Sequence, residues 1–130
     1  MTESGNKQRK DSRIQLGRLG EETACRFLRD AGYRIVERNW RCRSGEIDLI
    51  AEHEGRLVFV EVRSRTAGGR FGTAAESVDR RKQMQIRETA QVYLKSRMEA
   101  GASIQFDVVT VEVSRGDGSV VACSHYPRAF

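Results

Sequence analysis

The chain has 130 residues, of which 38% are hydrophobic and 32% are charged, a balance typical of one globular domain with a polar surface. Lys and Arg number 23 against 18 Asp and Glu, and the formal net charge of +5 is compatible with a polyanionic partner. No apolar stretch approaches the roughly 20 residues that a membrane-spanning helix needs, and the N-terminus lacks the apolar core of a secretory signal.

The three cysteines, Cys25, Cys42 and Cys123, are odd in number, far apart in the sequence and without any C-x-x-C spacing. This distribution argues against a structural zinc site and against a framework of disulfides. Free thiols fit best in a reducing compartment, so the composition favours the cytoplasm.

The beginning of the chain divides into a polar segment and a helix. Residues 1–13 are polar and charged, so we predict a disordered tail there, followed by a single domain over residues 14–130. In the segment Ile14–Ala31 the apolar residues take helical spacing over its second half. Gly32 follows as a natural C-terminal stop, and the sequence therefore predicts a first helix that ends just before it.

Three strands are predicted after the first helix, two of them joined by a tight turn around Gly55. They cover Tyr33–Trp40, Glu46–Ala51 and Leu57–Arg63. The last is apolar at every position before Glu61, as expected for a central strand that is buried on both faces. The turn at Gly55 predicts that the second and third strands form an antiparallel hairpin.

A second helix and two more strands complete the predicted chain. A glycine-rich mobile loop is expected over Ser64–Ala75, and a helix over Asp79–Ala100, with Asp79 as its N-cap. The residues expected to face the core from this helix are Ile86, Ala90, Tyr93, Leu94 and Met98. Strands are expected over Ile104–Val113 and Ser119–Ser124. The order α-β-β-β-α-β-β predicts an α/β fold with a central mixed five-stranded sheet flanked by helices.

Acidic side chains interrupt two of the predicted strands. Because side chains alternate along a strand, Asp48 shares a face with Glu46, and Glu61 shares a face with Arg63. A hairpin would bring both pairs to one region of the sheet, where burial of a charge is costly unless it is paired or coordinates a metal. Two carboxylates and a backbone carbonyl form an all-oxygen site suited to Mg²⁺ or Mn²⁺. The alternative from spacing alone is an ion pair of Asp48 or Glu61 with Arg63.

These residues carry a resemblance to known proteins. Asp48, followed by Glu61-Val62-Arg63, is similar to the PD-(D/E)xK pattern of restriction-endonuclease-like nucleases. Over nearly the whole chain beyond the tail, the sequence more closely resembles the bacterial YraN family. The motifs that carry this resemblance are Gly17-x-x-Gly20-Glu21-x-x-Ala24, Arg38-Asn39-x-Arg41, Gly45-Glu46-Ile47-Asp48-Leu49-Ile50-Ala51, Phe59-Val60-Glu61-Val62, Phe71-Gly72, Val78 with Lys82, Ala90 with Tyr93-Leu94, and Phe106-Asp107-Val108-Val109.

The resemblance implies a restriction-endonuclease-like fold and a metal-dependent active site. In that superfamily the acidic residues that match Asp48 and Glu61 bind the metal, here with the carbonyl of Val62 as a further candidate ligand. The YraN family is itself similar to archaeal Holliday-junction resolvases, in which a Glu on the first helix completes the acidic site, and Glu21 matches that residue. The alternative for Glu21 is an acid near the helix N-terminus that the helix dipole favours.

The sequence departs from the nuclease pattern at two positions. Ile47 stands where Pro is frequent, which we regard as harmless, and Arg63 stands where the superfamily has Lys. An arginine stabilises negative charge but almost never gives up a proton, so Arg63 is expected to steady phosphoryl oxygens and not to act as a base. We expect Lys82, in the first turn of the second helix, to replace the missing lysine. The alternative for Lys82 is a solvated surface lysine.

Four arginines near the acidic residues are candidates for contact with nucleic acid. Arg41 and Arg43 are expected on the turn between the first two strands, and Arg65 and Arg70 on the glycine-rich loop. Such contacts would go to phosphates and would position a duplex without reading its sequence.

The sequence therefore predicts a Mg²⁺- or Mn²⁺-dependent endonuclease that hydrolyses DNA, with branched or structured DNA as a candidate substrate. Two alternatives stay open. One is a catalytically inactive nucleic-acid-binding protein on the same fold, in which the Lys-to-Arg change at Arg63 has removed turnover. The other is a structural or interaction protein whose acidic pocket is an ion-pair network. Resolvases cut two strands as dimers, so the resemblance also suggests a homodimer.

Overall fold

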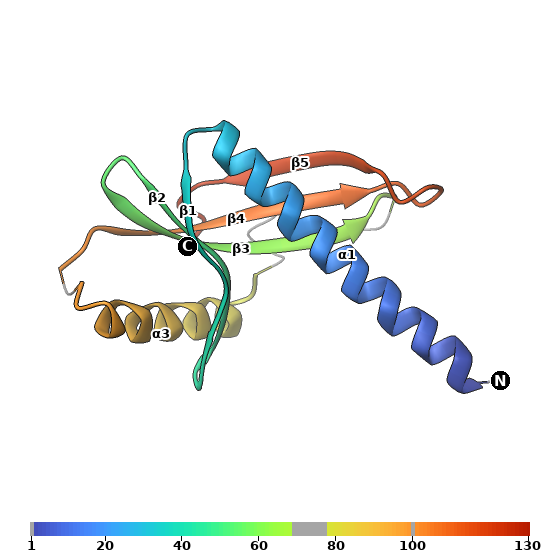
Figure 1. Cartoon of the computed structure of the whole chain (residues 1–130), viewed down its shortest axis with the longest axis horizontal. Helices are drawn as coiled ribbons and strands as arrows, with labels where there is room; N and C mark the ends of the chain where they lie inside the picture. The colour runs from blue at the N-terminus through green and yellow to red at the C-terminus, as the bar shows by residue number, and fades with distance from the viewer. Residues whose placement is uncertain (1, 69–77, 100) are drawn as a thin grey trace.

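The computed structural model describes residues 2–68, 78–99 and 101–130, with side chains from residue 10 onward. Five strands and two helices make up this part of the chain (Figure 1). In chain order they are α1 (Thr2–Asp30), β1 (Arg34–Cys42), β2 (Gly45–His53), β3 (Arg56–Thr66), α3 (Arg80–Ser96), β4 (Ile104–Val113) and β5 (Val120–Tyr126). Neither helix in this part of the chain is long and apolar enough to span a membrane.

The five strands form a single mixed sheet in the order β1-β2-β3-β4-β5. The pairs β1–β2, β2–β3 and β4–β5 are antiparallel, whereas β3 and β4 are parallel. A parallel pair needs a long crossover, and the segment that contains α3 provides it. The predicted α/β class, the order of the elements and the mixed five-stranded sheet are confirmed.

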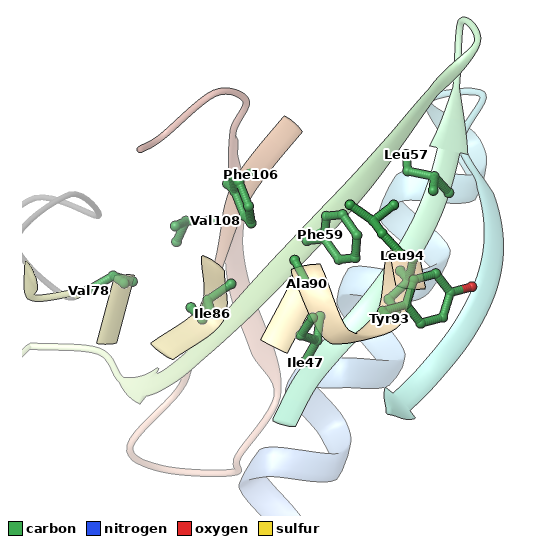
Figure 2. Packing of buried hydrophobic residues seen from close by; sticks show 11 residues of the cluster. Ile47, Leu57, Phe59, Val78, Ile86, Ala90, Tyr93, Leu94, Phe106 and Val108 are labelled. Carbon is green, nitrogen blue, oxygen red and sulfur yellow. The ribbon is translucent and has the colours of Figure 1, made fainter. Parts of the chain in front are cut away.

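The two helices cover opposite faces of the sheet, and each face has its own apolar core. On the α1 face, Leu28 is buried with Val58 and Val60 of β3. On the α3 face, Phe59 of β3 packs in a cluster that includes Tyr93 (Figure 2). Because β3 contributes alternate side chains to the two cores, it is buried on both faces, as its apolar sequence predicts.

The first helix, α1, ends where the sequence predicts and begins earlier. Gly32 has a left-handed φ of +92°, the conformation that commonly ends a helix. The helix begins at Thr2, whereas we predicted a disordered tail over residues 1–13 and a helix from Ile14. Residues 10–13 are exposed, so local helical hydrogen bonds are the main stabilising contacts of this four-residue stretch of α1. The prediction that residues 1–13 are a tail separate from the domain over residues 14–130 stays a prediction.

The second long helix, α3, begins as predicted and ends earlier. Asp79 is its N-cap, and the side chain accepts a hydrogen bond of 2.8 Å from the backbone amide of Lys82. The helix ends at Ser96 and not at Ala100. Met98 takes a left-handed φ of 54° and is 92% exposed, so the prediction that it faces the core is wrong. The other four residues expected to face the core are buried.

The sheet forks between β2 and β3. The backbone pairing of these strands stops at Leu49 and Val60. Beyond that point β2 continues beside β1 as far as Gly45, and β3 continues beside β4 as far as Thr66. Figure 1 shows the far end of the β1–β2 hairpin and the far end of β3 running in different directions. Backbone groups that face the fork have no strand opposite them, so other groups must satisfy them.

A glycine lets α1 approach β3 beside this fork. A Cβ atom on Gly20 would lie 1.7 Å from the hydroxyl oxygen of Ser64 and 3.0 Å from its Cβ atom. A Cβ atom on Gly17, one turn earlier, would meet no described atom within 4 Å. The close contact at Gly20 therefore fixes α1, and with it the neighbouring Glu21, over the end of β3.

We expect Gly20→Ala to lower the free energy of unfolding and Gly17→Ala to raise it. Each substitution gains up to about 1 kcal/mol of helix propensity, but overpacking against Ser64 costs roughly 1–3 kcal/mol and acts at Gly20 alone. Urea denaturation of the two variants measures the difference. Equal shifts in both variants would show that α1 does not approach β3 so closely.

Candidate metal centre and adjoining cleft

Asp48 lies at the fork, in β2, just past the last backbone pair that joins β2 to β3. Its Oδ2 accepts a hydrogen bond of 2.8 Å from the backbone N–H of Val62 in β3. Regular alternation breaks here, because Ile47 packs in the core on the α3 face whereas Leu49 packs in the core on the α1 face. The Asp48 side chain therefore reaches across the fork to the backbone of β3.

Glu61 is the second acid at the fork, and only 6% of its surface is exposed. It follows Phe59 by two residues in β3, so it lies on the α3 face of the sheet. Its carboxyl group is close enough to Asp48 for a side-chain hydrogen bond, and its Oε1 lies 3.9 Å from Nε of Arg63. The hairpin thus brings together the two carboxylates that the sequence analysis assigns to the site.

Both carboxyl groups have raised pKa values. Desolvation by burial raises the pKa of Asp48 to about 7, and the nearby Glu61 carboxylate adds to the rise. The N–H of Val62 opposes it, because this donor stabilises the charged form. Burial also raises the pKa of Glu61, against the positive charges of Lys82 and Arg63. The positive groups nearby therefore do not balance the charge of the pair fully, and near neutral pH the pair is partly protonated.

Two further glutamates add negative charge at the fork. Glu21, half-buried in α1, is close enough to raise the pKa of Asp48. It lies well inside α1, which begins at Thr2, so our alternative of an acid near the helix N-terminus is wrong. Glu46 in β2 acts on both Asp48 and Glu61. Glu46 is not among the residues predicted for the site, although its place two residues before Asp48 is a signal for it.

The atoms that could hold a metal at the fork are oxygens. Asp48 and Glu61 offer carboxylates, and the carbonyl of Val62 projects to the same strand edge as its N–H. Among the described residues, no three His, Cys, Asp or Glu side chains come together as a complete metal-binding cluster. A cation here would therefore keep several water ligands, as Mg²⁺ usually does. It would also replace the proton that the crowded pair retains, so the donor set fits Mg²⁺ or Mn²⁺.

A cleft of about 780 Å³ adjoins the acidic pair. Arg63 and Lys82 line this cleft, and both act on the carboxylate of Glu61, so the cleft and the pair are contiguous. Arg81 adds a third positive side chain to the lining. The Nε atom of Arg63 is buried and has no hydrogen-bond partner among the described residues. Because Nε itself is buried, an anionic oxygen that enters the cleft would meet the exposed part of the Arg63 side chain.

The four arginines expected at nucleic acid lie in different settings. Arg41 is in β1 and not on a turn, and its Nε lies 3.3 Å from Oε1 of Glu46, with which it is ion-paired. Arg43 is exposed on the β1–β2 turn. Arg65 is in β3 and not on a loop, and it is ion-paired with Glu112 at 3.1 Å. Arg70 lies outside the described residues. Both strands are longer than predicted, because their backbone pairing continues past the apolar residues.

We expect Asp48→Asn to stabilise the metal-free protein, and more so at pH 8 than at pH 5. Folding raises the pKa of Asp48 from 3.8 to about 7, so the folded state binds the proton more tightly and stability falls as the pH rises through this range. Asparagine removes this dependence and still offers an oxygen to the N–H of Val62. The gain at pH 8 should be about 1–3 kcal/mol, measured by urea denaturation in EDTA.

The matched control is Glu54→Gln, because Glu54 is an exposed carboxylate on the turn at the opposite end of the β2–β3 hairpin. The difference in stability between this variant and the wild type should not change from pH 5 to pH 8, because Asp48 is unaltered. If Asp48→Asn instead destabilised the protein equally at both pH values, the Asp48 carboxylate would be a favourable partner at the fork and not a destabilising one.

Comparison with known proteins identifies the family of the chain. The model of the uncharacterised protein family UPF0102 matches residues 20–111, which include the acidic pair and Lys82. A UPF0102 protein of Moorella thermoacetica is 49% identical over 104 residues, which are 80% of this chain and 86% of the relative. One of Pelotomaculum thermopropionicum is 45% identical over 120 residues (92% and 98%), and one of Nocardia farcinica is 49% identical over 106 residues (82% and 83%). The chain therefore belongs to the uncharacterised protein family UPF0102, the YraN family that its motifs resemble.

Proposed function

We propose that this protein is a divalent-metal-dependent endonuclease that hydrolyses phosphodiester bonds of DNA. The observation that carries the proposal is the crowded pair of half-buried Asp48 and buried Glu61, beside a cleft whose lining has three positive and two acidic side chains. The acidic pair suits a hard cation, and the positive side chains of the cleft, Arg63, Arg81 and Lys82, suit a phosphate backbone. The net charge of +5 agrees with a polyanionic substrate.

The proposed metal ligands are the carboxylates of Asp48 and Glu61 and the carbonyl of Val62. Glu21 would support the site from α1, through its charge and not through a direct contact with Asp48. When bound there, a divalent cation polarises a phosphodiester and lowers the pKa of a water ligand. Arg63 would stabilise the negative charge that develops on phosphoryl oxygens through the donors of its guanidinium.

Lys82 is the residue that we propose for the role of the lysine in the nuclease pattern. It is half-buried in the first turn of α3 and lines the cleft. Among the charged groups that oppose the raised pKa of Glu61, Lys82 has the largest effect. This interaction favours a lysine that belongs to the site over a solvated surface lysine. Lys82 would orient the attacking water and balance the charge of the acidic pair.

We expect Mn²⁺ or Mg²⁺ to raise the melting temperature of the wild type and not that of Asp48→Asn. At a free-ion concentration one hundred times the Kd, binding to the folded state adds roughly 2.7 kcal/mol of stability. Thermal denaturation with increasing MnCl₂ measures the effect, and Glu54→Gln should respond as the wild type does. An equal response of all three proteins would remove Asp48 from the metal site and favour an ion-pair network.

We expect the wild type to cleave labelled DNA in Mg²⁺ or Mn²⁺, with linear, branched and single-stranded substrates compared side by side. Asp48→Ala, Glu61→Ala and Lys82→Ala should each lower the cleavage rate by roughly 100-fold or more while DNA binding is retained. Glu54→Gln should cleave at the wild-type rate. Activity that persists unchanged in both Asp48→Ala and Glu61→Ala would come from another site or from a contaminant, and would overturn the proposal.

The Arg63→Lys variant separates the enzyme from its main alternative. If Lys82 has replaced the missing lysine, Arg63→Lys should change the cleavage rate only slightly. If the wild type binds DNA without any metal-dependent cleavage, and Arg63→Lys creates cleavage, the protein is a nucleic-acid-binding member of the fold that Arg63 has made inactive.

A further inference from the structure

A second group of positive side chains lies away from the acidic pair. Arg56 at the start of β3, Arg87 in α3 and Arg128 after β5 line a pocket of about 490 Å³. Among the described residues, none of these three arginines forms an ion pair, and no acidic side chain lines the pocket. Guanidinium groups around one hollow repel one another, and an anion in the hollow would relieve this repulsion.

Aromatic rings hold Arg87 in place, and its side chain forms no hydrogen bond to the described part of the chain. Its Cζ atom lies 4.8 Å from the ring centroid of Phe106 and 5.7 Å from that of Phe130. The two rings are themselves stacked, with centroids 5.3 Å apart. Cation–π contact restrains a guanidinium through its face, so the N–H donors at its edge stay available to a ligand.

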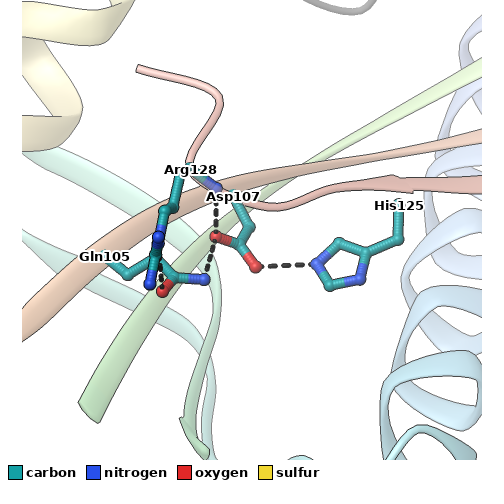
Figure 3. A network of polar contacts seen from close by, with 4 residues as sticks. All are labelled: Gln105, Asp107, His125 and Arg128. Atoms are coloured by element: carbon teal, nitrogen blue, oxygen red, sulfur yellow. Dashed lines mark hydrogen bonds and ion pairs between the residues drawn. The ribbon is translucent and has the colours of Figure 1, made fainter.

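Arg128 is positioned by a buried carboxylate that binds its backbone. Asp107 in β4 is completely buried, and it accepts hydrogen bonds from Nε2 of Gln105 at 2.9 Å and from the backbone N–H of Arg128 at 3.0 Å (Figure 3). Nε2 of His125 lies 2.7 Å from the other oxygen of Asp107. Arg128 has a left-handed φ of 53°, which these contacts stabilise. Asp107 thus sets the course of the chain after β5 and leaves the guanidinium of Arg128 at the pocket.

The arginine pocket is joined to the cleft at the acidic pair. A hollow of about 240 Å³ shares Met84 and Glu88 with the cleft, and shares Arg87 and Phe106 with the arginine pocket. The three hollows follow α3 from its first turn, where Lys82 lies, toward Arg87. Because Glu88 repels phosphate, the phosphates of a bound strand would lie on either side of it, over the two positive ends of this path.

We propose that Arg87 and Arg128, with Arg56 at the rim, bind a backbone phosphate of the nucleic acid that occupies the cleft, an inference that rests on the proposed function. Guanidinium groups match phosphate oxygens in geometry as well as in charge. Arg56 is assigned to the rim because it also borders a hollow lined by Glu52 and Glu99. Such a contact positions the nucleic acid and carries no sequence information.

The test is the affinity of the full chain for labelled DNA, measured by fluorescence anisotropy in EDTA over a series of salt concentrations. Arg87→Gln/Arg128→Gln should bind about 10-fold more weakly on every sequence, and the slope of log K against log salt should fall by about 1, as expected for one lost phosphate contact. The control Arg34→Gln/Arg97→Gln removes the same net charge from two arginines that are ion-paired with glutamates. It should change neither the affinity nor the slope appreciably.

A lysine pair checks that charge, and not damage to the fold, causes the loss. Arg87→Lys/Arg128→Lys keeps both positive charges and should keep most of the salt slope. Equal weakening of binding by the glutamine pair and by the control pair would overturn the proposal. So would an equal fall in the slope of log K against log salt for the lysine pair and the glutamine pair, or a wild type that binds no DNA.

The same variants separate this inference from the proposed function. Binding that depends on Arg87 and Arg128, without cleavage by the wild type, would support the phosphate position and overturn the endonuclease. Cleavage that Asp48→Ala abolishes, with no difference between the glutamine pair and the control pair, would support the endonuclease and overturn the phosphate position.

Discussion

The fork between β2 and β3 is the constraint on which the rest of the structure depends. Where the two strands separate, the backbone N–H of Val62 has no strand opposite it, and a buried donor of this kind needs a partner. The carboxylate of Asp48 provides that partner at 2.8 Å. The unpaired N–H of Val62 thus holds an acidic side chain at the fork. The same separation gives Glu61 room to lie beside Asp48 and leaves the adjoining cleft between β3 and α3.

At the fork the charges of the acidic pair are only partly balanced by the neighbouring groups. Glu61 has Lys82 and Arg63 to oppose its raised pKa, whereas Asp48 has one backbone N–H and three neighbouring acids that act against its ionisation. A purely structural ion-pair network would balance these charges, because an unbalanced buried carboxylate costs stability. Strain of this kind is typical of functional sites, and it favours a site that gains a cation over one that only holds strands together.

The sequence predicted the features that local chemistry determines. The alternation in β3, the N-cap at Asp79 and the stop at Gly32 depend on neighbouring residues, and the structure has all three. It could not predict how far strand pairing extends, so Arg65 was expected on a loop and lies in β3. The sequence also could not predict the arginine pocket. Asp107 positions Arg128 only because the chain after β5 returns to β4, and no local sequence pattern indicates such a long-range contact.

In the proposed enzyme, Arg63 on β3 and Lys82 on α3 would share the role that one lysine has in the nuclease pattern. An arginine on β3 offers a planar fork of donors to phosphoryl oxygens, while a lysine on α3 offers a compact ammonium group on a flexible stem. In the proposed enzyme, α3 then has a second task, because it carries Lys82 at the cleft and Arg87 at the arginine pocket. These residues are five positions apart, about 7.5 Å along the helix axis. Since a helix of this length is stiff, α3 would set the spacing between the reacting phosphate and the second bound phosphate, and so the register of the nucleic acid on the protein.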